Sequence, residues 1–117
     1  MAQGFNPEGL VKPFGIFSNA AWAPKGEVLF ISGIVATDEE GNTVGVGDIR
    51  AQTRQVLENI KTILTSVGGT MDDIQVVNVF VTDMSGLKDI HEVRAEYFNP
   101  PYPASTLVQV VSLVKPE

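Results

Sequence analysis

Four stretches of the chain carry the apolar pattern of β-strands. Residues 14 to 20 alternate large and small side chains, and residues 28 to 36 form a continuous apolar run. Residues 73 to 82 and 106 to 114 are two further runs rich in β-branched side chains. Short runs of this kind are typical of strands, and the continuous run predicts a buried central strand. Pro24 and Gly26 predict a turn between the first two strands.

A segment with helical periodicity lies between the second and third of these strands. Apolar side chains recur at spacings of three and four between Ile49 and Val67, so they form one stripe on a helix. Asp48 is placed to cap the first turn, and Gly68 follows the last one. A second, shorter helix with the same spacing is predicted within residues 85 to 97.

The predicted order is β-β-α-β-α-β, which favours an α+β sandwich with two helices on one face of a mixed sheet. We expect a single domain over residues 1 to 117. The strands carry apolar side chains for both faces of the sheet, so we expect the uncovered face to meet another chain in a homo-oligomer. The alternative is a small sheet covered by the chain's own long loop. The side chains concerned are Val28, Phe30, Val76, Val108 and Val110.

Composition and charge exclude several functional classes. The chain has 117 residues, 44% hydrophobic and 19% charged, with a net charge of −6 and no basic cluster. This charge disfavours binding to nucleic acid. No apolar run approaches the roughly 18 residues of a membrane helix, and the first residues do not resemble a signal peptide. We therefore expect a cytoplasmic protein without membrane or nucleic-acid partners.

The short motifs of catalysis and cofactor binding are missing. The sequence has no glycine-rich phosphate loop and no GxSxG, so neither a nucleotide site nor a hydrolase triad is indicated. One histidine and no cysteine make a metal site improbable. We expect no metal and no cofactor.

Four residues are candidates for lining a site. His91 lies at the edge of the apolar stripe of the second helix, either as a partly buried structural histidine or as a site residue. Arg94 shares that edge, either as an exposed cation beside acidic neighbours or as a site residue. Ser32 and Gly33 interrupt an apolar strand, which indicates either a ligand close to the backbone or a bulge packed on a neighbouring chain.

A proline-rich loop precedes the last strand. Its sequence, PPYPAST, delivers Ser105 and Thr106 to the start of that strand, where they either begin the strand or hold a ligand. The residues alone indicate an oligomeric α+β domain with a candidate cleft for a small molecule, and they name no reaction.

Taken as a set, several segments resemble the Rid family of YjgF-like reactive-intermediate deaminases. The segments are FGIFSNAAW, VLFISGIVATDEEGN, AQTRQVLENIK, VVNVFVTDM, EVRAEYF and NPPYPAS. The resemblance implies a chorismate-mutase-like fold and a homotrimer with an inner sheet barrel and a cleft at each subunit interface. It also implies hydrolysis of enamines and imines, such as 2-aminoacrylate, to a 2-oxo acid and ammonia without metal or cofactor.

The resemblance assigns positions to the site one at a time. The backbone of Ser32 and Gly33 would contact the ligand carboxylate or the reacting nitrogen. Phe17 stands where relatives have a tyrosine, His91 where they have a pocket-lining asparagine, and Arg94 where a tyrosine is common.

The proline loop departs from the family pattern. Relatives usually have PAR followed by Ser or Thr, and that arginine clamps the substrate carboxylate. Here Ser105 takes its place, and Leu107 stands where many relatives have Cys or Thr. The family's final strand, with its water-orienting glutamate, would follow Glu117 and is not in the sequence.

These departures leave three hypotheses. The first is a divergent enamine or imine deaminase with a different substrate, or with Arg94 or His91 taking over anion binding. No catalytic residue is assigned. The second is a non-catalytic trimer that binds a small metabolite or serves a regulatory role. The third is a ribonuclease, which the net charge of −6 disfavours.

Overall fold

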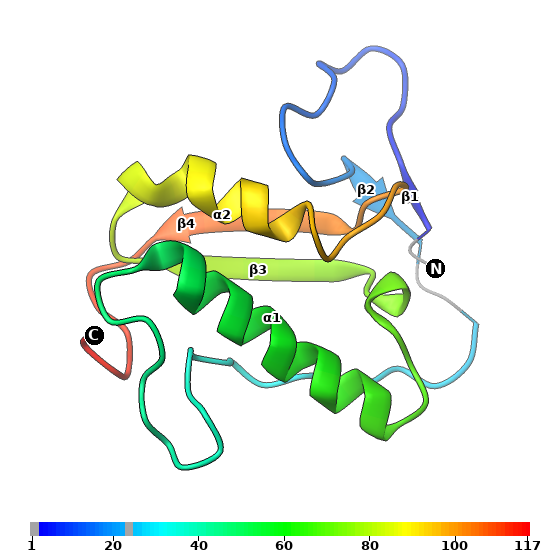
Figure 1. The fold of residues 1–117 in the computed structure, drawn as a ribbon. Helices are drawn as coiled ribbons and strands as arrows, with labels where there is room; N and C mark the ends of the chain where they lie inside the picture. The colour runs from blue at the N-terminus through cyan, green and yellow to red at the C-terminus, as the bar shows by residue number, and fades with distance from the viewer. Residues whose placement is uncertain (1–2, 23–24) are drawn as a thin grey trace.

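In the part of the chain that the structure describes, the fold has two α-helices and two strand pairs joined by turns and longer loops (Figure 1). The computed structural model describes residues 3–22 and 25–117, so Pro24 of the predicted turn lies outside the described residues. The main elements are α1 (Ile49–Ser66), β3 (Val76–Val81), α2 (Leu87–Arg94) and β4 (Ala104–Gln109). The minor elements are β1 (Gly4–Phe5), β2 (Ala20–Ala21), and the 3₁₀ turns Met71–Asp73 and Met84–Gly86.

The central sheet is a parallel pair. β3 and β4 run side by side in register from Val76 opposite Ala104 to Val81 opposite Gln109, with α2 in the crossover between them. Ser18 extends this sheet by a single parallel bridge to Ala104. β1 and β2 form a separate antiparallel pair.

Both helices cover the same face of the β3–β4 sheet, as Figure 1 shows. Side chains of β3 alternate, with Val77, Val79 and Val81 more buried than their neighbours. The core lies between this face and the helices and contains Leu57, Leu64, Met71, Val93 and Phe98. The predicted α+β class, with its two helices on one face, is therefore confirmed.

The start of α1 was predicted correctly because its signal is local. The Asp48 carboxylate accepts hydrogen bonds from the amides of Arg50 and Ala51, each at 3.1 Å. These bonds satisfy donors that the first turn leaves without an intrahelical partner.

The prediction of a strand over residues 28 to 36 is wrong. The segment runs as an unpaired trace along α1, and Phe30 is 89% exposed. Its end is held by Asn59, whose Nδ2 donates to the Thr37 carbonyl at 2.9 Å. A strand needs a neighbour for its backbone groups, and no described segment forms a ladder with this one.

The other predicted strands are shorter than the sequence pattern indicated. The stretch 14–20 contributes the Ser18 bridge and the first residue of β2. The last strand ends at Gln109 rather than at residue 114. The described strands therefore form two separate pairs, parallel and antiparallel, in place of one large mixed sheet.

The face of the β3–β4 sheet opposite the helices exposes apolar side chains. Phe80 is 55% exposed and Val108 is 38% exposed, and Val76 lies exposed on the same strand as Phe80. The expected oligomer remains a prediction. Within the described part of the chain, neither helix is long and apolar enough to cross a membrane.

Candidate functional site

Arg94 occupies the centre of the candidate site. The residue is only 3% exposed, and its Nη2 donates to the carbonyl of Ile16 and to Oγ of Ser105, each at 3.1 Å. The guanidinium carbon lies 5.8 Å from the ring centroid of Phe98, a distance at which the aromatic face attracts a cation. One arginine thus joins α2, the segment before β2 and the start of β4.

Two local patterns bring Arg94 and Ser105 together. On α2, Arg94 follows Ile90 by four residues, so both lie on the helix face that packs against the sheet. On β4, Ser105 is the register partner of Val77, which packs against the core on the helix-covered face. Register partners in a parallel pair point to the same face, so Ser105 points toward α2.

The charge of Arg94 has no acidic partner among the described residues. Burial lowers the pKa of its guanidinium, and no carboxylate opposes that effect. The acidic side chains on α2 and just after it pair instead with arginines of α1, Asp89 and Glu92 with Arg50, and Glu96 with Arg54.

His91 lies one helical turn before Arg94 and faces the segment that carries Ile16. A Cβ atom added at Gly15 would lie 3.3 Å from its Cε1, so the glycine allows the ring to approach the backbone. The Nδ1 atom is buried without a hydrogen-bond partner in the described structure. Burial, and secondly the charge of Arg94, lower the pKa of His91, so the imidazole is neutral at pH 7.

Phe17 and Leu107 are near this cluster along the chain, Phe17 directly after Ile16 and Leu107 two residues after Ser105. Phe17 contacts Phe14 edge to face, with 5.5 Å between ring centroids. Its ring lines a cavity of about 410 Å³ together with Gly15, Tyr102 and the N-terminal loop. Leu107 follows Ser105 by two residues on β4, so it shares the helix-covered face and is half-buried.

Ser32 and Gly33 lie apart from the other predicted site residues. Both are exposed on the unpaired segment 28–36, which runs along α1 in Figure 1. A Cβ atom added at Gly33 would meet no atom within 4 Å. Within one chain, Phe17, His91, Arg94 and Ser105 lie around the backbone of residues 15–17, and Ser32 and Gly33 lie on a separate segment.

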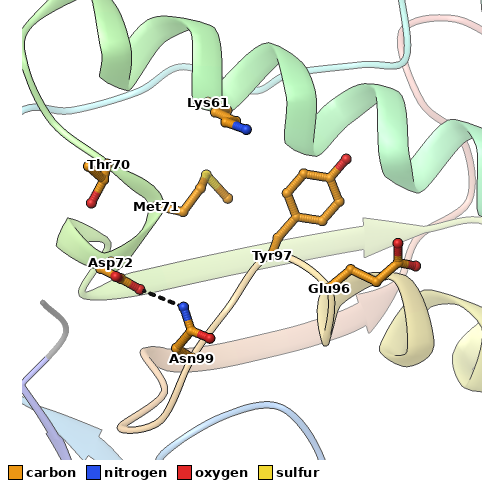
Figure 2. A pocket seen from close by; sticks show the side chains of 7 residues that line it. All are labelled: Lys61, Thr70, Met71, Asp72, Glu96, Tyr97 and Asn99. Atoms are coloured by element: carbon orange, nitrogen blue, oxygen red, sulfur yellow. Dashed lines mark hydrogen bonds between the residues drawn. The ribbon is translucent and has the colours of Figure 1, made fainter.

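A second pocket, of about 280 Å³, opens between α1 and the end of α2 (Figure 2). In it, Asn99 donates to the Asp72 carboxylate at 3.2 Å. Burial, with a contribution from Glu58, raises the pKa of Tyr97 to about 12. None of the residues predicted to form the site lines this pocket. Its lining residues are Lys61, Thr70, Met71, Asp72, Glu96, Tyr97 and Asn99.

Sequence reasoning missed three contributors to the Arg94 site. These are the Ile16 carbonyl, the Phe98 ring and the close approach at Gly15. The carbonyl carries no side-chain signal. Phe98 follows Arg94 by four residues, and this spacing could have indicated the contact.

Comparison with known proteins covers almost the whole chain. Residues 10–117 match the family model described as endoribonuclease L-PSP. A RutC family protein from Pyrococcus horikoshii is 43% identical over 108 residues, which is 92% of this chain and 84% of the relative. The 3-aminoacrylate deaminase RutC of Acinetobacter baylyi is 41% identical over 111 residues, 95% of this chain and 86% of the relative.

The fold has a close counterpart among solved structures. A conserved Rid-family protein of unknown function from Yersinia pestis superimposes with a TM-score of 0.89 at 34% identity. The match covers 99% of this chain and 90% of that one.

Proposed function

Because this chain belongs to the endoribonuclease L-PSP family, which includes the Rid (YjgF) proteins, we propose that it hydrolyses small enamines or imines. The products are an oxo compound and ammonia. The observation that carries this proposal is the 41% identity to a 3-aminoacrylate deaminase over 95% of the chain. Family membership supports enamine and imine deamination as the class of reaction.

The reaction requires no covalent bond between the protein and the substrate. An enamine takes a proton on carbon and becomes an imine, water adds to the imine carbon, and the carbon–nitrogen bond then breaks. The nitrogen leaves as ammonia once it has gained a proton, and a carbonyl remains. Catalysis therefore depends on holding the substrate, placing a water molecule and moving protons.

The gathered residues suit this task in part. Arg94 supplies a buried positive charge, and the Ser105 hydroxyl lies beside it. His91 supplies a neutral imidazole on the same helix. Ser105 stands where relatives carry a carboxylate-clamping arginine, so this chain needs another anion contact or takes a different substrate.

The proposal includes a homotrimer with its clefts between subunits. Apolar side chains on the uncovered sheet face, Phe80 and Val108 among them, support an association of chains. Ser32 and Gly33 are exposed while Arg94 is buried, and a shared site forms if a neighbouring chain supplies this pair.

A non-catalytic metabolite-binding trimer is the second candidate. The observation that favours it is Ser105, since the loss of a bidentate arginine contact costs a relative about 2–3 kcal/mol of transition-state stabilisation. A ribonuclease is not proposed, because a net charge of −6 without a basic cluster opposes RNA binding.

The test generates the unstable substrates in place. A PLP-dependent dehydratase releases 2-aminoacrylate, an amino-acid oxidase releases a series of larger imines, and release of the oxo acid is followed with and without the protein. We expect acceleration over buffer for at least one substrate. No acceleration for any member contradicts deamination, and ligand binding without turnover supports the second candidate.

A further inference from the structure

We propose that Arg94 and Ser105 bind the carboxylate of a small organic acid, an anion that the chain itself does not supply. The inference rests on the proposed function and deepens it, because it assigns the substrate's anion contact to a new pair of residues. It also holds for a protein that binds such an acid without converting it.

A buried charge without a partner is the first argument. Arg94 is 97% buried, yet its hydrogen bonds go to a neutral carbonyl and a neutral hydroxyl. Burying an ionised group is costly unless an opposite charge compensates it. A bound anion provides that compensation.

The acidic residues that could have served are engaged elsewhere. Asp89 and Glu92 lie on the same helix as Arg94 and Glu96 follows its end, and all three form ion pairs with arginines of α1. Within the described residues, the chain therefore keeps its carboxylates away from the buried guanidinium. This arrangement is expected of a site that receives its anion from outside.

The hydrogen-bond donors left over are the second argument. The Nε and Nη1 groups of Arg94 have no hydrogen-bond partner within the described residues. The Ser105 hydroxyl accepts a bond from Nη2 and keeps its own hydrogen free to donate. A carboxylate can accept a charge-assisted hydrogen bond from either of these guanidinium groups and a second bond from the hydroxyl.

The structure favours a carboxylate over a doubly charged anion. Arg94 offers one positive charge, and His91 adds none because its imidazole is neutral at pH 7. The net charge of −6 repels a second negative charge further. The contact with Phe98 holds the guanidinium in place before the ligand arrives, which lowers the entropic cost of binding.

A purely structural role makes a different prediction. If Arg94 only ties α2 to Ile16 and Ser105, then Arg94→Met removes two hydrogen bonds and lowers the melting temperature. If Arg94 also binds an anion, a saturating carboxylate should raise the melting temperature of the unsubstituted protein and leave that of Arg94→Met unchanged.

The experiment titrates the full chain with 2-oxobutyrate and follows binding by calorimetry and by the backbone amide signals in NMR. In the unsubstituted protein, we expect the amides of Ile16 and Ser105 to shift. We expect Arg94→Met to weaken binding by about 10- to 100-fold, the range of a lost charged hydrogen bond. Ser105→Ala should weaken it less, by a few-fold.

Matched controls separate charge from fold. Arg54→Met removes an exposed arginine that pairs with Glu96 and should leave binding unchanged. The neutral amide of 2-oxobutyrate should not bind at the same concentrations.

Absence of binding to the unsubstituted protein, equal binding of acid and amide, or full binding by Arg94→Met overturns the assignment. The outcomes also distinguish the two proposals. Binding that depends on Arg94 without turnover of any imine rejects the deaminase and keeps this site. Turnover that survives Arg94→Met keeps the deaminase and rejects this site.

Discussion

Phe80 of β3 and Val108 of β4 are register partners in the parallel pair, and both side chains are exposed on the sheet face that no helix covers. Apolar cross-strand pairs of this size normally pack against another layer. Their position explains why the uncovered face, rather than a helix, is the surface proposed for association.

The first prediction concerns this face. Phe80→Glu places a charge in the proposed interface and should convert a trimer into a monomer, as measured by light scattering on a sizing column. Phe14→Glu is the matched control, because Phe14 is also a highly exposed aromatic residue but lies outside the sheet. An unsubstituted protein that is monomeric at high concentration would reject the proposed interface.

The second prediction concerns the single histidine, whose NMR signal needs no assignment. We expect the pKa of His91 to lie below 6.5 in the folded protein and to rise in Arg94→Met, since the arginine charge contributes to lowering it. A carboxylate bound at Arg94 should also raise the pKa. A pKa that does not respond to either change contradicts the proximity of the two side chains.

The same pKa has a consequence for stability. The folded state binds a proton on His91 less readily than the unfolded state does, so the histidine contributes stability above about pH 6.5. This contribution is lost as the pH falls from 6.5 toward the folded pKa. The free energy of unfolding, measured in urea at several pH values in that window, should rise with pH, and His91→Asn should reduce this dependence.

The third prediction concerns Tyr97 in the second pocket. Its pKa of about 12 lies above the ordinary value of 10.0, chiefly because of burial, so its phenolate should appear late in an alkaline absorbance titration. Tyr97→Phe should remove the late step, and Glu58→Gln should move it to lower pH. The stability that the neutral phenol contributes is present below pH 10.0 and lost as the pH rises through about 12.

The fourth prediction tests the cap of α1. Asp48→Ala removes the acceptor of the Arg50 and Ala51 amides and should lower the free energy of unfolding by about 1 kcal/mol. Asp48→Asn keeps a capping oxygen and should lose much less. Equal losses in the two variants would show that the capping bond is not what stabilises this turn.

Local signals predicted the helices well. The first helix was expected from Ile49 to Val67 and runs from Ile49 to Ser66, because both its period and its cap lie within the segment. A strand was expected over residues 73 to 82, and β3 runs over Val76–Val81 within that apolar run. The prediction of a strand over residues 28 to 36 was wrong because an apolar run does not indicate which segment will pair with it.

The sequence named candidate site residues but not the contacts among them. The sequence offered both an exposed and a site-lining Arg94, and the structure buries it. Its contact with Ser105 depends on how α2 packs over β4, which no spacing along the chain encodes.

Because Ser32 and Gly33 are exposed on the unpaired segment along α1 while Arg94 is buried on α2, the proposed cleft takes its two halves from neighbouring chains. Specific activity should then fall on dilution, with the same concentration dependence as dissociation of the proposed trimer. Two inactive variants, one altered at Gly33 and the other at Arg94, should regain activity when they are unfolded, mixed and refolded together. In the mixed assemblies, some interfaces again join two intact halves.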